Sequence, residues 1–128
     1  MVDALAATDV LPGGRRIVVA GEMLELGSTA EELHRRCGRH MVEQGIDVIL
    51  GVRGLAKFIV EGVCEAQTPF AAETEYLDTP EMAGEWLARM TRPADLVLLK
   101  GSRGVRLERA LELWRERVKA AEDLRIEN

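Results

Sequence analysis

The sequence has few aromatic residues and no excess of basic ones. Only five of its 128 residues are aromatic, and the formal net charge is −5. Residues 61–85 contain seven acids and neither lysine nor arginine. Nucleic-acid binding needs a basic stripe that displaces counterions, and single-strand binding also needs aromatic platforms for base stacking. We therefore expect no nucleic-acid partner.

Cysteine and histidine are equally scarce. The two cysteines, Cys37 and Cys64, have neither the spacing of metal ligands nor that of a redox pair. Cys37 falls at a core position of an expected helix, which favours a buried, reduced thiol. His34 and His40 are six residues apart on that helix and therefore point to different faces. We expect no metal site, and we interpret His34 as a surface or satisfied core histidine rather than a catalytic base.

Long apolar runs are absent as well. No run approaches the ~20 residues of a membrane helix, and the N-terminus lacks the basic region and apolar core of a signal peptide. With 47% hydrophobic and 30% charged residues, the composition is that of a soluble globular protein. No linker or low-complexity segment interrupts it. We therefore expect a single cytoplasmic domain over residues 1–128, without a membrane partner.

The usual nucleotide-binding motifs are also missing. The sequence contains neither G-x-x-x-x-G-K-[ST] nor G-x-G-x-x-G. The segment Gly51–Gly54 lacks the lysine and hydroxyl that phosphate binding needs, and no nucleophile–base pair stands close together in the sequence. The chain is therefore not a complete nucleotide-driven enzyme by itself.

Short apolar runs alternate with amphipathic segments along the chain. The expected strands cover residues 16–20, 47–51, 95–99 and a short segment that includes Phe70 or Tyr76-Leu77. The expected helices run from Ser28 or Thr29 to Gly45, over residues 54–65, from Thr79-Pro80 onward and from Ser102 onward. This alternation predicts an α/β fold with a doubly wound, mostly parallel sheet of about four to six strands and helices on both faces. We expect the strands at 16–20 and 95–99 to be interior.

The last two helices have apolar stripes that predict their buried faces. The first stripe consists of Met82, Trp86, Leu87 and Met90, and the second of Leu107, Leu111, Trp114 and Val118. Ser102 is the expected cap of the final helix.

Lys100, Gly101, Ser102 and Arg103 form the best candidate site. They follow an apolar strand, and open α/β sheets collect ligands at the carboxyl ends of their strands. A helix N-terminus there would attract an anion, Arg103 could grip a carboxylate in two-pronged geometry, and Lys100 adds a point charge. The alternative is a Ser-capped helix start with solvated basic residues.

Glu22 and Met23 stand directly after the first expected strand. A carboxylate at Glu22 can hold an ammonium group, orient a metal-bound water or a ribose hydroxyl, or cap a turn. Met23 and the following leucines are unusually apolar for a loop, which indicates packing either on another surface or in the core.

Four segments together resemble a known family. They are Gly21–Gly27, Glu32–Arg35, Gly45–Asp47, and Lys100–Gly104 with Leu107-Glu108. In order and spacing they resemble the C-terminal domain of the Mur ligase family, in the branch that adds D-Ala-D-Ala to UDP-MurNAc-tripeptide in peptidoglycan synthesis. The resemblance runs from about Arg15 to Leu111.

The resemblance implies a Rossmann-like domain of a three-domain enzyme. In this family a central ATPase domain uses ATP and Mg²⁺ to form an acyl phosphate, which the incoming amine attacks. The third domain closes the site and carries the dipeptide, so that Lys100, Gly101, Ser102, Arg103, Glu22 and Met23 would bind substrate. No catalytic or cofactor-binding residue is assigned to this domain alone, which is expected to be inactive and to bind no cofactor by itself.

Two departures from the family pattern and two alternatives accompany this reading. Glu22 stands where the family usually has Asp, and the chain starts after the family's Tyr-Asn-Ala-Asn-Pro segment, which contacts nucleotide. One alternative is another ligase of the Mur and folylpolyglutamate group with a different amino-acid substrate. The other is a flavodoxin-like or receiver-like module, although residues 50–52 offer no phosphoacceptor aspartate. Phosphorylation by acetyl phosphate would identify a receiver.

Overall fold

The part of the chain that the structure describes contains nine elements of secondary structure. The structure is a computed structural model that describes residues 12–23, 27–66, 72–101 and 106–127, with side chains up to Asp123 in the last stretch. Its strands are β1 (Arg16–Gly21), β2 (Val48–Val52), β3 (Glu73–Leu77) and β4 (Leu96–Lys100). Its helices are η1 (Gly27–Thr29), α2 (Ala30–Glu43), α3 (Ala56–Glu65), α4 (Pro80–Met90) and α5 (Glu108–Glu127).

The four strands form one parallel sheet in the order β3-β2-β1-β4. The expected parallel α/β architecture is therefore confirmed, and the order 3-2-1-4 is the one that opens the Rossmann fold. The short strand contains Tyr76 and Leu77, as one of the two options predicted, whereas Phe70 lies outside the described residues.

The expectation that both strands would be interior is right for β1 and wrong for β4. Within the described residues β4 pairs only with β1, and all five of its residues are half-buried. An apolar run indicates that both faces of a strand are covered, but it does not show that the strand has a neighbouring strand on each edge. The apolar sequence of β4 was therefore compatible with an edge position.

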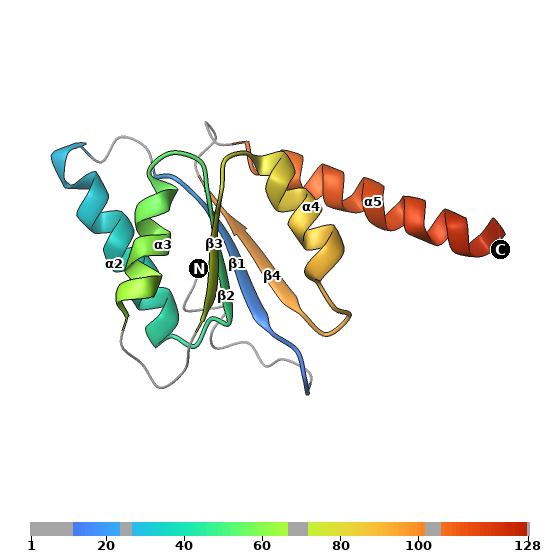
Figure 1. Ribbon diagram of the computed structural model, residues 1–128, viewed down its shortest axis with the longest axis horizontal. Coiled ribbons are helices and arrows are strands. Elements are labelled where there is room, and N and C mark those ends of the chain that lie inside the picture. The colour runs from blue at the N-terminus through green and yellow to red at the C-terminus, as the bar shows by residue number, and fades with distance from the viewer. Residues whose placement is uncertain (1–11, 24–26, 67–71, 102–105, 128) are drawn as a thin grey trace.

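Helices cover both faces of the sheet (Figure 1). Helices α2 and α3 lie on one face, and α4 and α5 lie on the other. Because side chains alternate along a strand, Val18 and Ala20 of β1 join the core under α2 and α3, whereas Ile17 and Val19 join the core under α4 and α5. The doubly wound arrangement predicted from the sequence is thus confirmed.

Helices α2 and α3 approach each other backbone to backbone at two glycines. A Cβ atom at Gly38 would lie 2.1 Å from the carbonyl oxygen of Ile59, and one at Gly62 would lie 2.1 Å from that of Arg35. Arg35 and Arg39 then form ion pairs to acids of α3 across the outside of this crossing. The two helices therefore form a tight pair on one face of the sheet.

Helix α4 begins as predicted, but it buries a different stripe. The hydroxyl of Thr79 accepts a hydrogen bond from the amide of Met82 at 3.2 Å, and Pro80 starts the helix. Trp86 and Leu87 are buried as expected, whereas Met82 and Met90 are 45% and 44% exposed. The buried face is instead completed by small residues, which an apolar stripe of large side chains does not reveal.

Helix α5 begins at Glu108, later than the start at Ser102 that was expected, and Ser102 itself lies outside the described residues. Leu107 is buried just before the helix and Ala110 within its first turn, while Leu111 and Trp114 are half-buried. Val118 was expected in the core but is 43% exposed. The reason is visible in Figure 1, where the second half of α5 extends beyond the sheet.

Candidate functional site

The loops after β1 and β4 meet at the carboxyl end of the sheet. A Cβ atom at Gly101 would lie 3.3 Å from the Cα atom of Gly21 and 2.8 Å from a methyl carbon of Leu107. The connection that follows β1 runs over one face of the sheet through α2, whereas the connection that leads into β4 runs over the other face through α4. The winding of the sheet therefore reverses between β1 and β4. Open α/β sheets bind ligands at such a point.

The structure brings four of the six predicted site residues to this end of the sheet. Glu22 and Met23 follow β1, and Lys100 and Gly101 end β4 and begin the next loop. Ser102 and Arg103 lie outside the described residues. The four described residues thus lie at the ends of the two strands that they were expected to follow, and their role in substrate binding stays a prediction.

The carboxylate of Glu22 lies against the first turn of α3. Its Oε2 atom accepts a hydrogen bond from the amide of Leu55 at 2.9 Å, and a Cβ atom at Gly54 would lie only 2.1 Å from that oxygen. A negative charge is favourable at a helix N-terminus, where amide groups lack carbonyl partners. Among the roles considered from the sequence, the capping role is thus present, and it joins the loop after β1 to the loop after β2.

Lys100 points to the α2 side of the sheet. Leu98, two residues earlier on β4, packs against the core under α2 and α3, and alternation places Lys100 on the same face. Burial raises the pKa of the half-buried Cys37 thiol on α2, and the positive charge of Lys100 partly offsets this rise. Lys100 is half-buried and forms no ion pair within the described part of the chain.

His34 is completely buried, and both of its ring nitrogens are engaged. The amide of Met23 donates a hydrogen bond to Nε2 at 2.9 Å, and Nδ1 lies 2.5 Å from the carbonyl oxygen of Ala30. Of the two interpretations given for His34, a surface histidine or a satisfied core histidine, the structure shows the second. Its contact with Met23 was not predictable, because nothing in the sequence pairs a helix residue with that loop.

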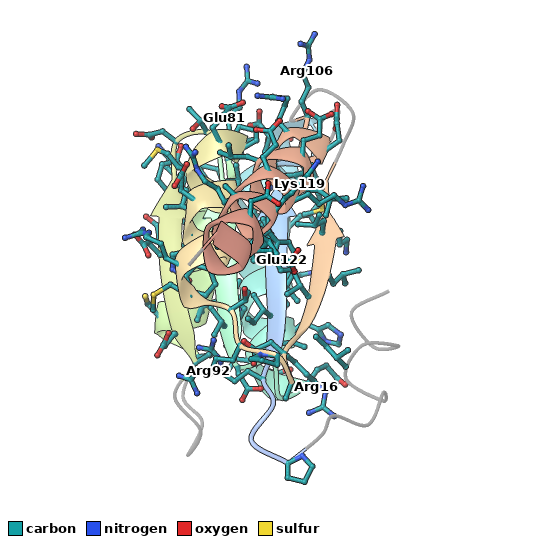
Figure 2. The ribbon with its side chains drawn as sticks, turned by 90° about the vertical axis from the view of Figure 1, so that its right-hand side faces the viewer. Arg16, Glu81, Arg92, Arg106, Lys119 and Glu122 are labelled. Atoms are coloured by element: carbon teal, nitrogen blue, oxygen red, sulfur yellow. The ribbon has the colours of Figure 1, made fainter. Side chains whose placement is uncertain are left out.

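Sequence reasoning missed a hollow of about 290 Å³ at the same end of the sheet. Two arginines that line it, Arg53 and Arg106, have left-handed backbone with φ of 69° and 55°. Figure 2 shows Arg106 and Glu81 at this end and Arg16, at the start of β1, at the opposite end. Glu81 also faces Arg109 at 3.7 Å, so acids balance much of the positive charge here.

The described residues contain no group of three histidine, cysteine or acidic side chains that could hold a metal ion. Among them, no helix is both long and apolar enough to span a membrane.

Comparison with known proteins decides the family. Residues 1–103 match the family described as Mur ligase, glutamate ligase domain. The chain belongs to the Mur ligase family. The resemblance inferred from the four sequence segments is thereby confirmed, and the receiver-like alternative is set aside.

Within the Mur ligases, the chain is similar to the C-terminal domain of MurF. It is 33% identical over 111 residues to the UDP-N-acetylmuramoyl-tripeptide–D-alanyl-D-alanine ligase of Bacillus subtilis, covering 84% of this chain and 23% of that protein. The Rickettsia prowazekii enzyme of the same name is 25% identical over 114 residues, covering 89% of this chain and 24% of that protein. The chain thus spans about a quarter of the length of these relatives.

Solved Mur ligase structures share the fold. MurF from Thermotoga maritima in complex with ADP superposes with a TM-score of 0.68 at 25% identity, covering 94% of this chain and 25% of that one. A MurF structure from Acinetobacter baumannii superposes with a TM-score of 0.70 at 23% identity, covering 87% of this chain and 23% of that one. The Rossmann-like fold expected from the sequence is therefore shared with MurF ligases.

Proposed function

We propose that this chain is the amine-binding domain of an ATP-dependent ligase that joins D-Ala-D-Ala to UDP-MurNAc-tripeptide through an acyl phosphate. Two relatives whose names state the joining of these two substrates support the proposal. Since the chain spans about a quarter of their length, its partner would be a central ATPase domain that supplies the phosphate-binding loop. The domain alone would neither hydrolyse ATP nor ligate.

The observation that carries the proposal is the positive charge of Lys100, a half-buried residue, at the point where the winding of the sheet reverses. This cation has no acidic partner among the described residues, and it ends β4 directly beside the end of β1. A cation at the carboxyl end of parallel strands, with no acidic partner among the described residues, is suited to bind an anion. The carboxylate of an incoming amino acid or dipeptide is such an anion.

The roles of the neighbouring residues follow from the geometry of the reaction. The amine of the dipeptide must reach the acyl phosphate, so its far carboxylate needs an anchor that sets the distance. We assign this anchoring to Lys100, Ser102 and Arg103, and a guanidinium suits it through its two parallel donors. Gly101 lets the loop pass beside Gly21. Glu22 and Met23 would form the opposite wall of the site.

ATP and Mg²⁺ do not fit the described residues. The described part of the chain offers no group of acids for a metal, and the sequence has no phosphate-binding loop. We therefore assign both to the central ATPase domain.

Variants at Arg103 and Lys100 test the proposal in the complete ligase. Loss of a charged hydrogen-bond partner in a closed site costs about 2–5 kcal/mol, which is on the order of a 30- to 4,000-fold loss of rate. We expect Arg103→Ala to raise KM for D-Ala-D-Ala and to lower kcat/KM, with KM for ATP nearly unchanged. Lys100→Ala should do the same, or should lower kcat if its charge faces the developing oxyanion.

Exposed residues of α5 provide matched controls. Arg115→Ala and Lys119→Ala remove the same side chains from a solvated helix face and should leave the kinetics unchanged. A normal KM for D-Ala-D-Ala in Arg103→Ala would contradict the anchoring role assigned to Arg103. A wild-type ligase that rejects D-Ala-D-Ala would overturn the proposed function itself.

A ligase that adds glutamate is the second candidate, because the family description names a glutamate ligase domain. The two are separated by offering the complete ligase D-Ala-D-Ala and L-glutamate side by side. ADP release that depends on the dipeptide supports the first proposal, and release that depends on glutamate supports the second.

A further inference from the structure

His34 connects α2 to the loop after β1 by a single, directional contact. A backbone amide can only donate, so Nε2 of His34 must accept from Met23 and Nδ1 must carry the proton that goes to Ala30. The imidazole is therefore neutral and held in one tautomer. One of its bonds stays within α2, and the other reaches a residue eleven positions away at the candidate site.

Burial makes this contact informative. His34 is 0% exposed, and a leucine could occupy a buried position of this kind without bringing two polar atoms into it. A buried polar group contributes little net stability when it is satisfied and costs about 1–3 kcal/mol when it is not. The need to fill the core therefore does not explain a histidine at position 34. The need to fix the position of the Met23 amide does explain it.

Two neighbouring residues of the loop are held from different sides. The Glu22 carboxylate binds the Leu55 amide at the start of α3, and the next residue, Met23, binds His34 on α2. One residue earlier, Gly21 lies against Gly101 of the loop after β4. The end of β1 is therefore fixed relative to both helices and to the opposite wall of the site.

We propose that His34 is a positioning residue, which holds the Glu22–Met23 wall of the amine site in place without touching substrate. The inference rests on the proposed function for its kinetic consequence but not for its structural one. A displacement of about 1 Å in a positioned group can cost on the order of a hundredfold in rate. Loss of the Met23 contact should therefore lower kcat/KM for the amine substrate about ten- to a hundredfold.

Two amide substitutions separate positioning from simple stability. In His34→Gln the terminal oxygen can occupy the place of Nε2 and accept from Met23. In His34→Asn the shorter amide can reach Ala30 but leaves Met23 without an acceptor. Both variants bury an uncharged amide in place of the imidazole. His40→Asn on the exposed side of α2 is the control.

The kinetic arm uses the complete ligase with D-Ala-D-Ala, UDP-MurNAc-tripeptide and ATP. We expect His34→Asn to raise KM for the dipeptide with KM for ATP unchanged, and His34→Gln to recover most of the loss. A purely structural role would lower the amount of active enzyme equally for all substrates. Wild-type kinetics in folded His34→Asn, or equal defects in both variants, would overturn the proposal.

The structural arm uses this chain without substrate, so its outcome does not depend on the proposed function. Hydrogen exchange followed by NMR should show a protected Met23 amide in the wild type and in His34→Gln, and a fast-exchanging one in His34→Asn. The ¹⁵N signals of His34 should be those of the Nδ1–H tautomer. If the ligase rejects D-Ala-D-Ala but this pattern holds, the proposed substrate is wrong and the positioning role stands. An unprotected Met23 amide in the wild type would refute the positioning role.

Discussion

At the scale of single residues, the pair Arg15–Asp95 joins the starts of β1 and β4. The two side chains meet at 2.8 Å, and the Asp95 side chain is only 1% exposed. Asp95 also accepts hydrogen bonds from the amides of Arg15 and Arg92. Burial alone would raise the pKa of Asp95, but the hydrogen bonds from Arg15 and Arg92 outweigh it and hold this pKa below its usual value.

This pair makes stability depend on pH. Because the folded state favours the charged carboxyl, the contribution of Asp95 is complete above the unfolded pKa of ~3.9 and is lost as pH falls through the lower folded pKa. We expect Asp95→Asn to lower the free energy of unfolding by about 1–3 kcal/mol at pH 7. Urea unfolding at pH 7 and at low pH measures the difference, which should shrink in acid.

The exposed carboxyl of Asp123 provides the comparison. Asp123→Asn should have little effect at either pH. A constant penalty for Asp95→Asn across the pH range would mean that the Asp95 carboxylate charge is not the source of the stability.

At the scale of elements, the contact between α2 and α3 reverses the usual preference for alanine over glycine inside a helix. Alanine in a helix interior is more favourable than glycine by about 0.5–1 kcal/mol. At Gly38, however, an added Cβ would meet backbone atoms of α3, which cannot rotate away as a side chain can. Separation of the helices would then loosen the core beneath them.

Gly38→Ala should therefore destabilise the protein by about 3 kcal/mol, as overpacking does. Thermal or urea unfolding measures this, and Arg36→Ala, on the exposed side of the same helix, should be nearly neutral. A more stable Gly38→Ala variant would show that the two helices can move apart without loss.

The elements themselves were predictable from the sequence, but their rotation and neighbours were only partly so. The strand runs and the Thr79-Pro80 helix start depend on local chemistry and were found where expected. The exposure of Val118 depends on where the sheet beneath α5 ends, and that of Met82 depends on the small residues by which α4 packs. The local sequence pattern records neither. In the site, Lys100 and Glu22 followed from strand ends, whereas the Leu55 and His34 contacts arise only when distant segments pack.

At the scale of the whole molecule, the proposed function divides the substrates between domains, with the amine on this chain and the nucleotide elsewhere. We expect this chain alone to bind ATP weakly and to hydrolyse none, because the phosphate-binding loop would lie in another domain. Calorimetric titration of ATP into the chain measures this. Micromolar affinity would contradict the division of labour that we propose.

The sheet order also has a consequence for how the protein is made. Ile17 pairs with Val48 on one side and with Val97 on the other, so the second contact closes a much longer loop. Longer closures cost more chain entropy, and contacts between distant residues form slowly. On the ribosome, β1, β2 and β3 can associate early, while β4 can dock only after most of the domain has been synthesised. The proposed amine site would therefore form last, and a chain that lacks β4 would have no such site.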